Sequence, residues 1–151
     1  MNISVTRLTN QVEKMVELNR LFADVFEDNV YKDPSKMPSH DYLQSWLRNP
    51  DNVALVAQEG DNVVGGIVAY TLHKFEQERS EIYIYDLAVS RNQQRRGVGR
   101  QLVAEVCKIA KRQDSWTVFV QADEGDEAIK FYESLNPTEN LKTRNFDLPL
   151  N

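Results

Sequence analysis

Apolar and polar residues follow two rhythms along this chain, one typical of strands and one typical of helices. In residues 80–89, with the sequence SEIYIYDLAV, β-branched and aromatic residues crowd one short run, which predicts a strand. In residues 97–112 an apolar residue recurs every three or four positions from Val98 to Ile109, which predicts a helix with one apolar face. A basic turn with two closely spaced glycines separates the two elements.

The same rhythms predict the other elements. We expect strands at 3–8, 53–58, 63–73, 116–122 and 143–148, the fourth of them buried. We expect helices from a cap at Thr9 or Asn10 to about Phe26, from a cap at Ser39 to Asn49, and over 126–135. The second helix should place Tyr42, Leu43, Trp46 and Leu47 on one face, and 27–38 and 74–79 should be loops. Gly65-Gly66 inside a strand predicts a bulge or a close backbone approach.

The order of these elements predicts the fold class. Hairpins come first and a strand-helix-strand unit follows, which indicates an α/β protein of the α+β type, with a central mixed sheet covered by helices on both faces. The chain shows no repeat, low-complexity tract or linker, and its 151 residues suit one domain over 1–151.

Composition narrows the class of protein further. Apolar residues make up 41% and charged residues 27%, which is ordinary for a folded, water-soluble chain, and no apolar run reaches the length of a membrane span. Without a signal pattern and with the single cysteine Cys107, the sequence fits a cytoplasmic protein. The net charge of −5 disfavours a nucleic-acid partner and weakly suits a cationic substrate.

The turn between the strand 80–89 and the next helix has the chemistry of an anion site. Glycines at a helix N-terminus let an anion approach the backbone N–H groups, and the helix dipole favours negative charge there. Arg95, Arg96 and Arg100 add positive charge around Gly97 and Gly99. The turn lacks the pattern of a P-loop and of a dinucleotide fingerprint. From spacing alone, an ordinary solvated basic turn is an equal alternative.

A family resemblance changes that balance. The pattern Gln94-x-x-Gly97-x-Gly99, after a strand that ends Leu87-Ala88-Val89, resembles the acetyl-CoA-binding motif of the Gcn5-related N-acetyltransferases (GNAT). Residues 74–77 and 79–90 resemble the type I class of aminoglycoside 3-N-acetyltransferases almost residue for residue, and residues 120–123 and 125–126 resemble the same class. The likeness is strong from about Val63 to Leu135 and weak before Asp51.

The resemblance implies the GNAT fold and acetyl-CoA as the acetyl donor. In that family the turn amides hold the pyrophosphate, and the end of the central strand pairs with the pantetheine arm where two strands, here 80–89 and 117–122, splay apart. The implied cofactor-binding residues are Leu87, Ala88, Val89, Gln94, Arg95, Arg96, Gly97, Val98, Gly99 and Arg100.

Acetyl transfer to an amine needs a proton acceptor and gains from a proton donor. Asp86 and Glu81 on the central strand are candidate acceptors, and we favour Asp86 as a charge within an apolar strand end. Strict alternation places Glu81, Tyr83 and Tyr85 on one face and Asp86 on the other, and a bulge would reverse this. The alternative role of Asp86 is to accept backbone hydrogen bonds or pair with an arginine. Tyr132 is the candidate donor by resemblance, with a plain core tyrosine as an equal alternative.

Acidic residues near the end of the next strand suit a substrate with several ammonium groups. The candidate substrate-binding residues are Glu76, Tyr85, Asp86, Asp123 and Asp126. For Asp126, a simple role at a helix N-terminus is at least as good an interpretation. We expect no metal site, because His40, His73 and Cys107 lack ligand spacing.

The leading hypothesis is therefore an acetyl-CoA-dependent N-acetyltransferase that modifies an aminoglycoside antibiotic, at its 3-amino group, and so confers resistance. One alternative is a GNAT enzyme for another amine, such as a polyamine or a protein N-terminus. A second is a non-catalytic module that binds acetyl-CoA. The fold also accommodates a homodimer, although no stretch of the sequence identifies an interface.

Overall fold

The computed structural model describes residues 2–28 and 33–151, and its backbone contacts divide the chain into two compact units. The first unit ends at Gln121 and contains β1 (Ile3–Arg7), α1 (Val12–Val25), the short 3-10 helix η1 (Pro34–Lys36), α2 (His40–Arg48), β2 (Asn52–Glu59), β3 (Asn62–His73), β4 (Ser80–Val89), η2 (Arg91–Gln93), α3 (Val98–Arg112) and β5 (Thr117–Val120). The second unit, Ala122–Asn151, contains α4 (Ala128–Glu133).

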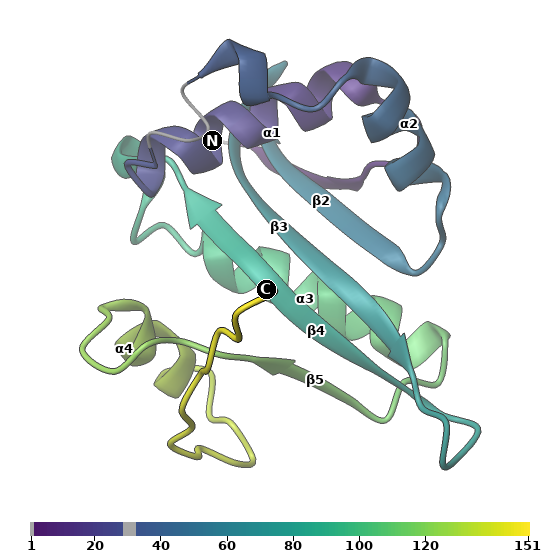
Figure 1. The fold of residues 1–151 in the computed structure, drawn as a ribbon. Coiled ribbons are helices and arrows are strands. Elements are labelled where there is room, and N and C mark those ends of the chain that lie inside the picture. Colours follow the sequence, from purple (N-terminus) through teal and green to yellow (C-terminus); the bar gives the residue numbers. More distant parts are fainter. Residues whose placement is uncertain (1, 29–32) are drawn as a thin grey trace. The chain divides into compact units, whose positions relative to one another are not determined.

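The first unit is built on a five-stranded mixed sheet in the order β1-β2-β3-β4-β5. Strands β1 to β4 pair antiparallel, and β5 runs parallel to β4 after the α3 crossover. Helices α1 and α2 cover one face and α3 covers the other (Figure 1). This architecture confirms the predicted fold class, a mixed sheet with helices on both faces.

Alternation along β2 produces the two cores. Val53 and Leu55 join an apolar cluster with the buried stripe of α3, whereas Ala54 and Val56 join a second cluster with α1 and α2. The predicted close approach at Gly66 is confirmed, because a Cβ there would collide with Leu18 of α1. The neighbouring β2–β3 register also shifts beside these glycines, between Ala57 and Gln58.

Strand β4 contains a bulge that decides which face its side chains occupy. Val68 of β3 lies opposite Asp86, but the next β3 residue, Ala69, lies opposite Ile84, so Tyr85 is the extra residue. Before the bulge, Ile84 packs in the α3 cluster. After it, Ala88 packs in the α1–α2 cluster, although both are even-numbered. Asp86, two residues from Ala88, therefore shares the α1–α2 face.

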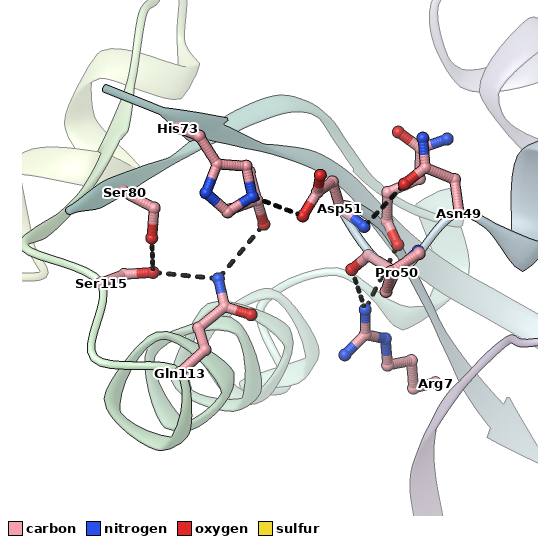
Figure 2. Close-up of polar contacts among 10 residues, drawn as sticks. Arg7, Asn49, Pro50, Asp51, His73, Ser80, Gln113 and Ser115 are labelled. Atoms are coloured by element: carbon pink, nitrogen blue, oxygen red, sulfur yellow. Dashed lines mark hydrogen bonds and ion pairs between the residues drawn. The ribbon is translucent and has the colours of Figure 1, made fainter. Parts of the chain in front are cut away.

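Polar side chains tie together the sheet end at which β4 begins (Figure 2). The Gln113 amide, just after α3, donates to Thr71 Oγ1 of β3 at 3.2 Å and to Ser115 Oγ at 2.9 Å. Ser115 in turn lies 2.8 Å from the hydroxyl of the buried Ser80, the first residue of β4. This network fixes the starts of β4 and β5 to the end of α3.

Two further contacts hold the neighbouring strands at the same end (Figure 2). His73 Nε2, at the end of β3, lies 2.8 Å from Asp51 Oδ1, just before β2. Arg7, the last residue of β1, donates to the carbonyl oxygen of Pro50 at 3.0 Å. Burial and the nearby Arg112 lower the pKa of the Arg7 guanidinium below its usual range.

Several predicted details are wrong. The predicted strand 143–148 is neither helix nor strand, because alternation of Phe146 and Leu148 reports a periodicity but supplies no pairing partner, and both side chains are exposed. The strand predicted over 116–122 spans only Thr117–Val120 and is half-buried, with Trp116 exposed. The helix predicted over 126–135 is shorter, at Ala128–Glu133.

One predicted helix cap is confirmed and the other is wrong. Ser39 Oγ accepts the N–H of Tyr42 at 3.1 Å, as expected for a cap of α2. Helix α1 instead follows Gln11, and Tyr42 is exposed rather than on the apolar face. Residues 29–32 of the predicted loop 27–38 lie outside the described residues, and η1 occupies part of the remainder.

Candidate active site

The turn after β4 is anchored to the sheet by two glutamine side chains. Gln93 is buried at the end of η2, and its amide donates to Glu59 Oε2 of β2 at 2.9 Å. Gln94 donates to the carbonyl oxygen of Val89, the last residue of β4, at 3.0 Å. These contacts fix the backbone immediately before the first turn of α3.

Gly97 forms the N-cap of α3 with a φ of +83°, a conformation that favours glycine. The first hydrogen bond of the helix runs from Gln101 N–H to Gly97 O, so the preceding amides point out of the helix end. A Cβ built on Gly97 would meet nothing within 4 Å, which leaves room for a ligand to approach. Exposed Arg95 and Arg100 flank this end. The residues present therefore fit a pyrophosphate group.

The last part of β4, next to this turn, is not paired with β5, and its free side forms a released edge at residues 87–89. The β4–β5 ladder ends at the pair Ile84–Val120, whereas β4 itself continues to Val89. On its other side the same segment stays paired, since Leu87 lies opposite Ile67 of β3. The ladder thus ends at the bulge, and residues 87–89 lie beyond it, as the pantetheine-binding role implied by the resemblance requires.

Asp86 lies directly after the bulge in a half-buried position. Burial raises the pKa of its carboxyl above the usual value of 3.8. Within residues 2–28 and 33–121, this carboxylate makes no hydrogen bond or ion pair. A carboxylate with a raised pKa and no bound partner in this unit is suited to accept a proton.

Glu81, the alternative proton acceptor, lies on the same strand but before the bulge. It is opposite Leu72 of β3 and Thr117 of β5, within the doubly paired part of β4. The bulge therefore brings both candidate carboxylates, Glu81 and Asp86, to one face, and Asp86 is the one beside the released edge. Strict alternation had separated them.

A row of aromatic rings, which was not expected from the sequence, lies on the Asp86 face. The row runs from α2 across three strands, with centroid separations of 6.0, 5.8, 5.9 and 4.8 Å between successive rings of Trp46, Tyr70, Tyr85, Tyr83 and Phe119. Burial, with the charge of nearby Asp86 as a lesser cause, raises the pKa of both Tyr70 and Tyr83. The sequence shows the period-two spacing of Tyr83 and Tyr85. It does not show which residues of the neighbouring strands lie beside them.

The remaining predicted site residues are divided between a loop of the first unit and the second unit. Glu76 lies in the β3–β4 loop, 3.6 Å from Lys74 Nζ and 4.0 Å from Arg79, at the opposite end of β4 from Gly97. Asp123, Asp126 and Tyr132 belong to the second unit, where Asp126 accepts the N–H of Ala128 at 2.8 Å. Their substrate-binding and catalytic roles stay predictions.

Metal-ligating clusters and membrane-spanning helices are both absent from the described residues. Residues 2–28 and 33–151 contain no group of three or more side chains suited to bind a metal ion. The same part of the chain contains no helix that is long and apolar enough to cross a membrane.

Solved structures similar to this chain over its whole length include two aminoglycoside acetyltransferases from uncultured soil metagenomic samples. One, HMB0005, is 36% identical with a TM-score of 0.92, and the match covers 100% of both chains. The other, meta-AAC0020 in complex with sisomicin, is 33% identical with a TM-score of 0.91, over 99% of this chain and 97% of that chain. No curated protein sequence matches this chain significantly.

A more distant structure shares the fold alone. The ribosomal-protein-alanine N-acetyltransferase from Brucella melitensis biovar Abortus 2308 is 17% identical with a TM-score of 0.74, over 98% of this chain and 100% of that chain. The model of the acetyltransferase (GNAT) family matches residues 15–136. This range includes the Gly97 turn, the released edge of β4 and Asp86. The chain belongs to the GNAT family of acetyltransferases.

Proposed function

We propose that this acetyltransferase transfers an acetyl group to an amino group of an aminoglycoside, at the 3-amino position, and thereby confers resistance to the antibiotic. The observation that carries the proposal is the end-to-end similarity to two aminoglycoside acetyltransferases at 33–36% identity. One of these was crystallised with the aminoglycoside sisomicin. The acidic, aromatic face of the sheet around Asp86 supports a cationic acceptor of this class.

Acetyl-CoA, which the family generally uses, supplies the acetyl group as a reactive thioester when bound. We assign its pyrophosphate to the N-terminus of α3, with Gly97 allowing close approach and Arg95, Arg96 and Arg100 supplying positive charge. The backbone of Leu87, Ala88 and Val89 then lies along the pantetheine arm. Gln94 keeps the turn attached to the strand through Val89.

Asp86 is the proposed proton acceptor. An aminoglycoside amine is largely protonated at neutral pH and has to lose a proton before it becomes nucleophilic. The raised pKa of Asp86 makes its carboxylate a stronger base than an ordinary aspartate. Glu81, on the same face, is the competing assignment. Tyr132 is the proposed donor of a proton to the departing thiolate, as the resemblance implies.

The acceptor is tested by measuring thiol release from acetyl-CoA with gentamicin, kanamycin, spermidine and a short peptide supplied separately. We expect fast release with the aminoglycosides and background release with the other two. Identification of the acetylated amine by NMR of the product then tests the 3-amino assignment. Fast release with spermidine or peptide alone would reject the aminoglycoside assignment while leaving the acetyltransferase in place.

The donor site is tested separately with Gly97→Val, using Gly60→Val as the matched control. Both glycines have a positive φ, +83° and +61°, and a Cβ on either would meet nothing within 4 Å. Backbone strain should therefore be similar in the two variants. Only Gly97→Val should weaken acetyl-CoA binding, by at least about tenfold for the loss of contacts worth 1.4 kcal/mol or more. Equal affinities in both variants would reject the pyrophosphate assignment.

A further inference from the structure

The row of rings described above, Trp46-Tyr70-Tyr85-Tyr83-Phe119, extends well beyond the neighbourhood of the candidate base. Tyr70 belongs to β3, Tyr85 and Tyr83 to β4, and Phe119 to β5, so the row crosses three adjacent strands. Tyr85 is 61% exposed, and the other rings of the row are only partly covered. Rings placed side by side on one sheet face offer a long apolar surface next to the half-buried Asp86.

The rings of this row are held in place before any ligand binds. The rings of Tyr83 and Phe119 stack nearly parallel, with centroids 4.8 Å apart and planes 10° apart. The Tyr83 hydroxyl donates to Gln121 Oε1 at 3.0 Å, which also fixes its tilt. Tyr85 meets Tyr70 edge to face at 85°. Because the rings already pack against one another, less side-chain conformational entropy is lost when a ligand binds.

The chemistry of the row selects for linked, positively charged rings. The apolar face of a sugar or aminocyclitol ring buries area against an aromatic side chain, and an ammonium group over such a ring gains cation–π attraction. Carboxylates lie at two points along the row, Glu81 before the bulge and Asp86 after it. A linear polyamine would use the charges but leave most of the apolar surface uncovered.

Building on the proposed function, we propose that the Tyr70-Tyr85-Tyr83-Phe119 row is an extended acceptor subsite that binds the linked rings of a multi-ring aminoglycoside. In this arrangement the ring that carries the reacting amine lies at Tyr85, beside Asp86. A second ring reaches along the row to the Tyr83–Phe119 pair. Phe119 is then a specificity-determining residue for the size of the acceptor, remote from the proton transfer.

The test compares two ligands that differ in the number of rings, by calorimetric titration into the protein saturated with CoA. Gentamicin has three linked rings, and 2-deoxystreptamine is the single aminocyclitol ring alone. Phe119→Leu should weaken gentamicin binding about tenfold, as expected for the loss of one stacking and cation–π surface, and change 2-deoxystreptamine binding less than twofold. Trp116→Leu removes a more exposed ring, which lies just before β5 under Arg79 and outside the row; it is the control and should change neither.

Two results would overturn the subsite. One is an unchanged affinity of Phe119→Leu for gentamicin, and the other is an equal loss for both ligands, because a local structural defect acts on both. Retained binding of 2-deoxystreptamine by Phe119→Leu guards against misfolding of the leucine variant. Turnover is measured in parallel. Tight gentamicin binding without acetyl transfer would reject the proposed function but not the subsite.

Discussion

The two halves of β4 differ in nearly every physical respect, although they belong to one ten-residue strand. The first half, to Ile84, is paired with both β3 and β5, and its first residue, Ser80, is buried in a hydrogen-bond network. The second half begins with the bulge at Tyr85, continues past the end of the β5 ladder and carries the half-buried Asp86. The first half is therefore held rigidly by pairing on both sides, whereas the second half is paired on one side only and has a free edge beside Asp86.

The difference shows how one inserted residue organises a site. The bulge turns Asp86 from the α3 face to the face that holds the aromatic row, at the point where the β5 ladder ends. The rigid half fixes the direction of the strand, so the position of the carboxylate depends on β-sheet geometry rather than on a mobile loop. Predictions that alter one half alone should separate these roles.

Insertion of a valine between Val68 and Ala69 of β3 should have the largest effect. The inserted residue would pair with Tyr85 and remove the bulge, so regular alternation would place Asp86 on the face of Ile84, in the apolar α3 cluster, where an unpaired carboxylate is strongly unfavourable. We expect at least about a 10²-fold loss of thiol release, with a lower melting temperature by circular dichroism.

Tyr85→Ala is the control for that insertion, because it keeps the length of both strands and the bulge. It should keep the position of Asp86 and lose only the contacts of one ring, which costs about tenfold or less in KM. Wild-type turnover in the insertion variant would show that the bulge does not position the base.

Asp86→Asn should lower kcat by roughly 10²- to 10⁴-fold, the usual range for removal of a general base, without changing acetyl-CoA affinity. Glu81→Gln, on the same face but in the rigid half, is the control and should retain most activity. In the wild type, kcat/KM should rise with pH, with a midpoint above 3.8, because burial raises the pKa of Asp86. Loss of activity in Glu81→Gln alone would transfer the role of base to Glu81.

The same substitution should raise stability at neutral pH. The pKa of Asp86 is higher in the folded than in the unfolded chain, so between those two values the folded state binds more protons. Wild-type stability therefore falls as the pH rises through this window and stays lower above it. Asp86→Asn should melt at a higher temperature than the wild type at pH 7, and the gap should close as the pH falls toward 3.8. A gap of constant size would contradict the assignment.

The sequence was sufficient to predict the elements that depend on residues close together in the chain. Apolar patterns predicted α3 and β4, and the residue type at Ser39 predicted a helix cap, since each depends on neighbouring residues in the chain. The family resemblance implied the Gly97 turn as a cofactor site, and the turn in the structure has the positive φ and open helix end that fit an anion.

The features that could not be predicted from the sequence depend on contacts between residues that are far apart in the chain. The face of Asp86 depends on the β3 register, since only the pairing of Val68 and Ala69 reveals the bulge at Tyr85. The aromatic row likewise depends on β5 lying beside β4, which places Phe119 against Tyr83. Alternation in residues 143–148 misled because a strand forms only where a partner edge exists.

Gln113→Ala should have the smallest effect, confined to the rigid half of β4. The substitution removes two side-chain hydrogen bonds that join α3 to Thr71 and Ser115, which lowers the free energy of unfolding by about 1 kcal/mol and the melting temperature by about 2–4 °C. His73→Ala, which breaks a more exposed contact to Asp51 at the same sheet end, should cost less than about 1 kcal/mol. Neither change should alter kcat by more than twofold, because the network lies before the bulge. A tenfold loss of kcat in Gln113→Ala would mean that the position of Asp86 depends on the anchored end of the strand, and that the two halves work as one unit.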